Sequence, residues 1–240
     1  RRILTGTLDG IEQTAGGKTL ATVSFRGFRI AIPIREMLVL EDRMPSGRAY
    51  ADYMNRLNRI LGTMLGAEID FIVKGIDSTT HSAVASRREA MLRKRQTFYL
   101  GKDVSGNPYI YPGRLVEARV IAVAEKVLRV EAFGIECAIF ARDLSWQWVS
   151  DVRDLYSVGD RVLVRVQEIS GEDAEHLSIR ADIRSTFSET SVDNLKKCQV
   201  QSKYAGKVTD LRGGVVYIRL NNGVNEIGRA SCRERVFGYV

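Results

Sequence analysis

Histidine, cysteine and long apolar runs are scarce in this sequence. It holds two histidines and three cysteines in 240 residues. The cysteines, Cys137, Cys198 and Cys232, are odd in number and lack the short spacing of metal ligands, so we expect neither a zinc site nor a disulfide framework. We expect a protein of the reducing cytoplasm, with Cys137 as a small core residue. No apolar run approaches about 18 residues, so we expect no membrane span.

Catalytic motifs are also missing. We find no nucleophile elbow, no coherent Ser/His/Asp set and no complete phosphate-binding loop. The segment Gly16-Gly17-Lys18-Thr19 copies part of such a loop, but it lacks the upstream glycine and a following helix. We interpret it as a hairpin turn. The sequence therefore predicts a protein that is not an enzyme, with no cofactor, metal or small-molecule substrate.

Positive charge is present in excess. The formal net charge is +7 and the sequence pI is about 9.4. This balance favours a polyanionic partner such as nucleic acid, although a basic protein without such a partner is the alternative. An apolar content of 45% is sufficient for packed cores in one to three domains.

The clearest strand pattern lies at residues 161–167. Val162, Val164 and Val166 alternate there with longer or polar residues. Period-two alternation of β-branched residues is typical of a half-buried antiparallel strand. Val158-Gly159-Asp160 precedes this strand as a turn, and Val152, Leu155 and Tyr156 have the spacing of a short helix. Strand, short helix, turn and strand is the connection found between the third and fourth strands of a five-stranded OB barrel.

An internal repeat organises the chain. Residues 23–37 align without a gap on residues 130–144, and a second match begins at Gly66 and Gly159. A third match relates the first strands of all three repeats, and it starts at Gly6, Ala118 and Gly206. The sequence therefore predicts a mainly β fold of tandem five-stranded OB barrels with short connecting helices and a truncated third repeat.

The repeats and linkers have the following expected bounds: 1–100 for repeat one with a trailing basic helix, 101–112 for a linker, 113–184 for repeat two, 185–194 for a second linker and 195–225 for a partial third repeat. Residues 226–240 resemble translated sequencing-adapter DNA and are expected to be an artefact. Repeat three is expected to stop before a third strand forms. Since the chain starts at Arg1 without methionine, we expect it to begin within a longer protein or after processing.

Two helices are expected in repeat one. Residues 49–65 carry apolar side chains, Tyr50 among them, at helical spacing, and we interpret them as the plug of the first barrel. Ser86 and Glu89 have the spacing of a capping box that opens a second, basic helix. Its cations form either a solvated face or an RNA contact.

The residues around Asp143 also carry a family resemblance. Asp143-Leu144-Ser145-Trp146, followed by the Val158-Gly159-Asp160 turn and the alternating valines, resembles a repeat of the ribosomal protein S-one family. This resemblance implies OB barrels that bind single-stranded RNA. It further implies mRNA as the partner, a role in translation and docking to the small ribosomal subunit.

The resemblance implies a binding surface in each repeat. This surface has aromatics on the second strand, a histidine near the end of the third strand, and an acid and a base on the last hairpin. At the positions that correspond to the family's aromatics, repeats one and two of this chain have cations. We therefore expect these repeats to have exchanged stacking for charge, with salt-sensitive and poorly selective binding. The candidate nucleic-acid-binding residues are Lys18, Arg35, Asp77, His81, Lys126, Arg129, Arg142, Lys207, Arg212 and Tyr217.

Two other functions fit the same sequence. The chain could be the RNA-binding accessory region of a nuclease or of a transcription or antitermination factor. Its barrels could also be protein-interaction modules whose charge serves solubility. One further alternative concerns the tryptophans, because Trp146 and Trp148 straddle a strand end, and we expect one to pack and the other to be exposed.

Overall fold

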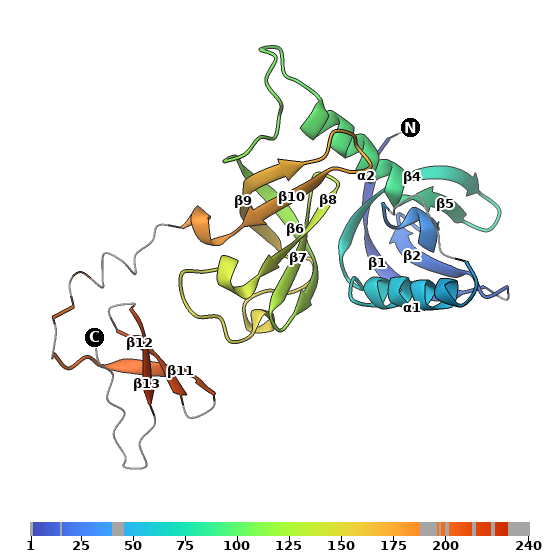
Figure 1. Cartoon of the computed structure of the whole chain (residues 1–240). Helices are drawn as coiled ribbons and strands as arrows, with labels where there is room; N and C mark the ends of the chain where they lie inside the picture. Colours follow the sequence, from blue (N-terminus) through green and yellow to red (C-terminus); the bar gives the residue numbers. More distant parts are fainter. Residues whose placement is uncertain are drawn as a thin grey trace.

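The computed structural model describes residues 2–14, 16–39, 46–187, 196, 198–199, 202–212, 215–221 and 224–229. Within these ranges the strands form three groups in chain order (Figure 1). Two groups of five strands are followed by one of three. This arrangement confirms the predicted mainly β fold built from tandem OB-type barrels.

Barrel one is closed, with the strand order β1-β2-β3-β5-β4. Its elements are β1 (Leu4–Gln13), β2 (Thr19–Phe25), β3 (Phe28–Pro33), the short 3-10 helix η1 (Ile34–Glu36), α1 (Arg48–Gly62), β4 (Glu68–Asp77) and β5 (Ser82–Ser86). Strands β3 and β5 pair in parallel, and the other neighbours pair antiparallel. Parallel closure between the third and fifth strands is what allows a five-stranded meander to become a barrel without exposed edges.

Helix α1 lies across one end of barrel one (Figure 1). Its apolar stripe places Leu57 and Leu61 in the barrel core, with Met64 just beyond the helix. The predicted plug is therefore confirmed for the second half of the helix. Tyr50, in the first turn, is not part of that core and is 36% exposed. Including it in the plug was wrong, because the first turn of the helix extends past the barrel end.

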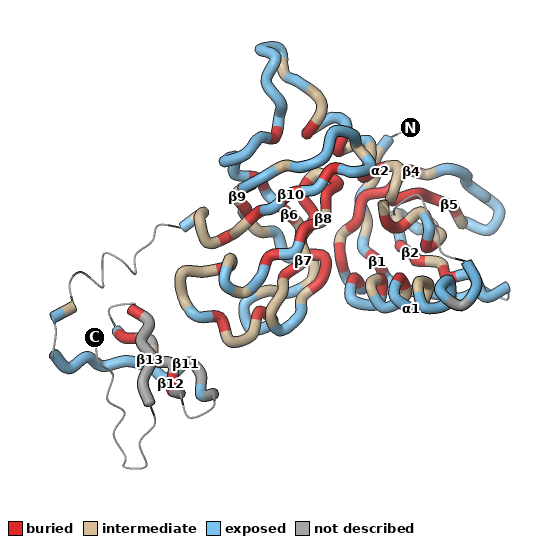
Figure 2. Tube along the Cα trace, in the orientation of Figure 1, coloured by how far each residue is buried: buried red, intermediate tan, exposed pale blue. Residues whose placement is uncertain are grey.

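Barrel two repeats this order with smaller connections. Its elements are β6 (Leu115–Ala124), β7 (Val127–Ala132), β8 (Ile135–Phe140), the 3-10 helices η3 (Ala141–Asp143) and η4 (Val152–Asp154), β9 (Arg161–Ser170), β10 (Ser178–Asp182) and η5 (Arg184–Thr186). The sheet order is β10-β9-β6-β7-β8, and β8 contacts β10 without forming a ladder. Buried stretches run along the strands of both barrels (Figure 2).

The alternating strand and the short helix before it are present in barrel two. Val164 and Val166 of β9 are fully buried, as the period-two pattern predicts. Val152 is also fully buried, whereas Leu155 is exposed because the helical piece ends at Asp154. Val152 and Leu155 therefore do not face the same way, although their spacing is helical.

The backbone repeats in detail between the barrels. The β2–β3 turn has positive φ angles at Arg26 and Gly27, of 49° and 81°, and the β7–β8 turn has 48° and 87° at Phe133 and Gly134. Two consecutive positive φ angles define the hairpin turn whose twist suits the flanking strands. The first strand of each group also has a β-bulge at the same place, after Leu8, Val120 and Val208. The matching β-bulges indicate that the three units are structural repeats.

The third group is a sheet of β11 (Gly206–Arg212), β12 (Val215–Leu220) and β13 (Asn225–Arg229). The expectation that no third strand would form was wrong, because β13 pairs antiparallel with β12 from Asn225 opposite Arg219 to Arg229 opposite Val215. β13 lies largely in the segment that we expected to be an artefact. Ladder hydrogen bonds come from the backbone, so an unpaired strand edge can be covered by a segment of almost any composition.

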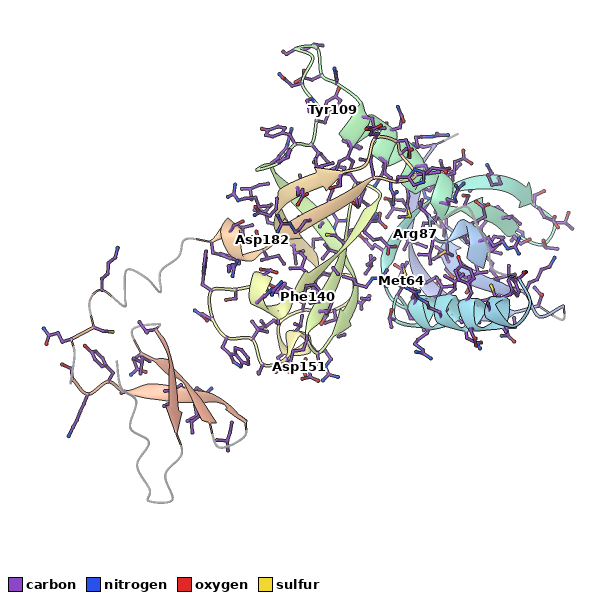
Figure 3. The ribbon with its side chains drawn as sticks, in the orientation of Figure 1. Met64, Arg87, Tyr109, Phe140, Asp151 and Asp182 are labelled. Atoms are coloured by element: carbon purple, nitrogen blue, oxygen red, sulfur yellow. The ribbon has the colours of Figure 1, made fainter. Side chains whose placement is uncertain are left out.

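Helix α2 (Arg87–Arg95), which continues as the π-helical turn η2 (Gln96–Leu100), joins the two barrels. Ser86 caps it by accepting a hydrogen bond from the Glu89 backbone nitrogen at 2.9 Å, which confirms the capping box. Arg87 is fully buried and lies between the barrels (Figure 3). It donates to Met37 O of barrel one at 2.7 Å and to Glu136 Oε1 of barrel two at 2.9 Å.

The cations of α2 are engaged in contacts within the protein. Lys94 bonds to Asp70, Arg88 pairs with Glu175 at 2.7 Å and Arg93 pairs with Glu89. Arg95 is buried, and its Nε donates to Gly134 O at 2.7 Å. Arg87 and Arg95 are therefore part of an interface between the barrels that the sequence did not predict, whereas Arg93 is exposed. The expected RNA contact of this helix stays a prediction.

Arg119 forms a second ionic contact between the barrels, and it shares Glu131 with Arg87. Arg119 of β6 donates from Nη1 to Asp70 Oδ1 of β4 at 3.1 Å and from Nη2 to Glu131 Oε1 of β7 at 2.7 Å. Burial alone would raise the pKa of Asp70, but hydrogen bonds from Arg119, Lys94 and Thr5 outweigh it and lower the pKa to about 2. Ile121 of β6 completes the contact by packing into the core of barrel one.

Candidate nucleic-acid interface

Barrel two has a groove at the end where β7 begins and β8 ends. We call it the barrel-two groove, and its volume is about 380 Å³. Its lining residues come from the β6–β7 turn, the end of β8, η3 and the loop that follows, and they are Lys126, Phe140, Ala141, Arg142, Gln147, Trp148 and Val149. Two of the ten candidate residues, Lys126 and Arg142, therefore meet in one concave site.

Backbone contacts fix these two cations beside each other. Ala141 N donates to Lys126 O at 2.9 Å, which ties the β6–β7 turn to the start of η3. The Lys126 ammonium group donates to Ser150 O and lies 5.9 Å from the centre of the Trp148 ring. The Arg142 side chain is 82% exposed, and its Cζ is 6.0 Å from the centre of the Phe140 ring. Both charges are thus held near aromatic faces while remaining accessible to solvent.

The aromatic side chains of this groove were missed at the sequence level. Phe140 is 51% exposed and Trp148 is 44% exposed. Repeat two therefore has exposed rings beside its cations, outside the second-strand positions, and the expected exchange of stacking for charge stays a prediction. A signal for Phe140 was available, because it continues the outward-facing series Glu136 and Ala138 of β8. Trp148 is the exposed member of its pair, as expected, while Trp146 is half-buried against Arg184.

Barrel one has a groove at the corresponding end. We call it the barrel-one groove, and its volume is about 840 Å³. Lys18, in the turn before β2, and Arg35, in η1, both line it. Tyr50 of α1 also lines this groove, and Arg35 Nη2 donates to its hydroxyl oxygen at 3.4 Å. Each barrel therefore combines a lysine before its second strand, an arginine after its third strand and an exposed aromatic from the next connection.

Asp77 and His81 lie at the other end of barrel one. Asp77 Oδ1 accepts the backbone N–H of Thr79 at 2.9 Å, and its contacts with Thr80 and Thr79 lower the pKa of its carboxyl group. The His81 ring lies 5.5 Å from that of Phe28, at the start of β3. Arg35 follows the opposite end of β3, about 17 Å away at the usual rise per strand residue. The structure therefore separates this pair from Lys18 and Arg35.

Arg129 lies in a third cavity of about 400 Å³, between α1 and the strands β7 and β8. It is bonded to Glu136, which Arg87 also contacts. Burial raises the pKa of Glu136, but Arg87 and Arg129 outweigh it, and the net direction is downward. Arg129 therefore balances a buried carboxylate, and the structure does not bring it into the barrel-two groove.

The last three candidate residues belong to the third sheet. Lys207 is an exposed residue of β11, paired in register with Arg219 of β12. Arg212 lies opposite Val215, and Tyr217 lies opposite Asp210. The side chains of Arg212 and Tyr217 lie outside the described part of the structure, so their predicted roles stay predictions.

Among the residues that the structure describes, no group of three or more His, Cys, Asp or Glu side chains is placed to hold a metal ion. None of the helices described there is long and apolar enough to cross a membrane. Cys137 is buried in the core of barrel two, as expected, and burial raises the pKa of its thiol to about 12.

The sequence of this chain is similar to those of known proteins. Residues 110–180 match the family described as S1 RNA binding domain. Small ribosomal subunit protein bS1 of Coxiella burnetii (strain RSA 493 / Nine Mile phase I) is 21% identical over 226 residues. That alignment covers 92% of this chain and 35% of the relative, so the chain spans about a third of the relative's length.

Two solved structures are also similar. The crystal structure of the a/eIF2alpha-aDim2p-rRNA complex from Pyrococcus horikoshii OT3 gives a TM-score of 0.30 at 20% identity, over 37% of this chain and 53% of that one. A multidomain protein with nucleic acid binding domains from Streptococcus pneumoniae TIGR4 gives 0.20 at 10% identity, over 99% and 64%. TM-scores of this size do not establish a common arrangement of domains.

The family match covers barrel two from β6 into β10, including both cations and both exposed aromatics of its groove. It also covers the strand and turn from which the resemblance was drawn. Residues 110–180 therefore belong to the S1 RNA-binding domain family, and the resemblance stated from the sequence is confirmed.

Proposed function

We propose that this chain binds single-stranded RNA, without catalysing a reaction, through the two barrel grooves. The observation that carries the proposal is the barrel-two groove, in which Lys126 and Arg142 lie beside the exposed rings of Phe140 and Trp148. Cations neutralise phosphates, and flat rings stack on unpaired bases. A duplex has its bases already stacked and so cannot use those rings.

The barrel-one groove supports the same proposal independently. Lys18, Arg35 and Tyr50 repeat the combination of cations and aromatic at the same end of the fold. The barrels are joined by buried ion pairs, so the two grooves keep a fixed relation to each other. One RNA strand that contacts both grooves would bind more tightly than either groove alone, because the second contact is intramolecular.

Fluorescence anisotropy with a labelled oligo-U and with duplex DNA of equal length tests the proposal. We expect binding to oligo-U at low salt, an affinity that falls steeply as salt rises, and weaker binding to the duplex. Absence of binding to oligo-U at low salt would overturn the proposal, and so would equal affinity for the duplex. A variant with charge reversal at Lys18, Arg35, Lys126 and Arg142 should lose binding, whereas unaltered affinity would favour a protein-interaction role for the barrels.

The finer proposal is that the RNA is mRNA and that the chain acts in translation in the cytoplasm, in association with the small ribosomal subunit. It is supported by the similarity to Small ribosomal subunit protein bS1. Cosedimentation of the chain with purified small subunits, with and without added oligo-U, tests the association. Failure to sediment with the subunits would remove the ribosomal part and leave RNA binding intact.

A further inference from the structure

The barrel-one groove has a wall that the barrel-two groove lacks. In barrel one the third and fourth strands are joined through α1, a helix of 15 residues, whereas barrel two has only the three-residue helices η3 and η4 there. The α1 residues in the wall lie three or four positions apart along one face of the helix, and they are Tyr50, Ala51, Met54, Asn55 and Asn58. With this wall the groove reaches about 840 Å³, against about 380 Å³ in barrel two. The larger volume is in the range of pockets that enclose a small ligand.

The interior of the barrel-one groove combines apolar surface with side-chain amides. Leu20, Pro33 and Met54 supply apolar contacts, while Asn55 and Asn58 supply amides from α1. Each amide offers a hydrogen-bond donor and an acceptor side by side. The edges of nucleobases present the same pairing of donor and acceptor, which is why Asn and Gln read them in known complexes.

Asn58 carries the specific signal. Its Oδ1 is buried, and within the described residues it has no hydrogen-bond partner. A buried acceptor without a donor is rare in folded proteins and points to a group supplied from outside. Rotation of the Asn58 amide toward the groove would expose this oxygen to an N–H of a base, which would then be the donor. A purely apolar ligand would leave the acceptor unsatisfied.

The rim of the groove suits the remainder of a nucleotide. The Tyr50 ring is partly exposed there, and Arg35 contacts its hydroxyl group. Lys18 lies on the opposite wall, in the β1–β2 turn that the Gly17 N to Thr14 O bond of 2.8 Å closes. The cations are therefore placed to meet phosphates, while the buried Oδ1 of Asn58 belongs to the α1 wall.

We propose that the barrel-one groove encloses a single unstacked nucleobase of the bound RNA and that Asn58, assisted by Asn55, reads its hydrogen-bonding edge. This inference rests on the proposed function, since the base belongs to the RNA strand. It differs from the expectation of poor selectivity for barrel one, which stays untested until the affinities are compared. Barrel two, with the smaller groove, then contributes charge and stacking with less discrimination between bases.

The test compares the affinities of the full chain for oligo-A, oligo-C and oligo-U of equal length, measured by anisotropy at one salt concentration. For the wild type we expect at least about a fivefold difference between the best and worst sequence, which is what one good amide–base contact supplies. Asn58→Ala should bring that ratio close to one while the affinity for the worst sequence changes less than about twofold. Asn55→Leu should shift the ratio in the same direction and, because Asn55 is exposed, should not perturb folding.

Asn107→Leu is the matched control, an amide-to-apolar change at an exposed turn outside both grooves. It should leave the ratio unchanged, and thermal unfolding of all three variants shows whether they fold. Equal affinities for the three homopolymers in the wild type would overturn the inference, as would an unchanged ratio in both α1 variants. If the wild type bound none of the homopolymers, the proposed function itself would fail, which is a different result.

Discussion

Arg87 Nη1 lies 2.9 Å from Glu136 Oε1 and 2.7 Å from Met37 O, so that one fully buried side chain bonds to both barrels. Burial by itself would lower the pKa of Arg87, but Glu131 and Glu136 outweigh burial and raise it. The two carboxylates compensate the charge of the buried guanidinium, although Arg87 Nε has no hydrogen-bond partner among the described residues. Through Arg87, the hydrogen bonds to Met37 and Glu136 therefore hold α2 against both the end of η1 in barrel one and strand β8 in barrel two.

Arg87→Leu should destabilise the chain by about 3–5 kcal/mol, because it removes the buried guanidinium from the Glu131 and Glu136 carboxylates, which then keep Arg119 and Arg129 as partners. Urea denaturation gives the free energy of unfolding. Arg180 occupies the same position in repeat two, but its side chain is 75% exposed, so Arg180→Leu should change the free energy by no more than about 0.5 kcal/mol. Equal effects of the two substitutions would contradict the structural role of Arg87.

Acid should weaken the contact between the barrels in a defined pH window. The pKa of Asp70 is lowered from 3.8 to about 2, so its ionised form stabilises the folded state by about 2 kcal/mol. That contribution is complete above pH 4 and is lost as the pH falls from about 4 to about 2. Urea unfolding between pH 5 and pH 2 should show the loss in the wild type. Asp70→Asn should be less stable at pH 5 and should have a flatter profile, and a profile identical to the wild type would count against Asp70 as the titrating group.

Removal of both cations from the barrel-two groove should weaken RNA binding and its salt dependence together. Lys126→Gln combined with Arg142→Gln removes two phosphate contacts, so the slope of log affinity against log salt should become shallower by about 1.4 for a single strand. Anisotropy titrations with oligo-U at several salt concentrations measure this slope. Arg180→Gln removes a charge outside both grooves and should leave the slope almost unchanged. A slope that the double variant does not alter would exclude phosphate contacts at this site.

Stacking should be separable from charge in the same groove. Trp148→Ala should cost about 1–3 kcal/mol of binding free energy if a base stacks on the ring, with little change in the salt slope. Trp148→Phe retains a flat ring and should recover part of the affinity. The same titrations measure both quantities. Stacking would be contradicted if Trp148→Phe recovered none of the lost binding free energy. It would also be contradicted if the loss in Trp148→Ala depended strongly on the salt concentration.

Arg129 and Arg142 were both candidate RNA contacts, but they occupy different environments. Arg129 is bonded to Glu136 in the cavity between the barrels, whereas Arg142 lines the barrel-two groove. Arg142→Gln should therefore lower oligo-U affinity more than Arg129→Gln does, and Arg129→Gln should mainly lower the free energy of unfolding. The reverse order would place the RNA in the cavity between the barrels.

Local patterns were sufficient for much of the fold. The alternation of Val162, Val164 and Val166, the capping box at Ser86 and the Gly16-Gly17 turn depend on neighbours within a few residues, and all three are present in the structure. The repeat was visible because the matched segments align without gaps. The third strand, β13, was not predicted, because strand pairing depends on an available edge more than on the identity of the added residues.

The sequence by itself determined that the chain consists of repeated barrels with an excess of positive charge. It did not distinguish cations that face solvent from those that balance buried carboxylates, and Arg87 and Arg180 align with each other in the repeat. Only the tertiary structure decided that Arg87 is buried between barrels while Arg142 lies in a groove beside Phe140. The physical reason is that the environment of a charge depends on the groups packed against it, and for Arg87 these are Glu131 and Glu136 of the other barrel, far away in the sequence.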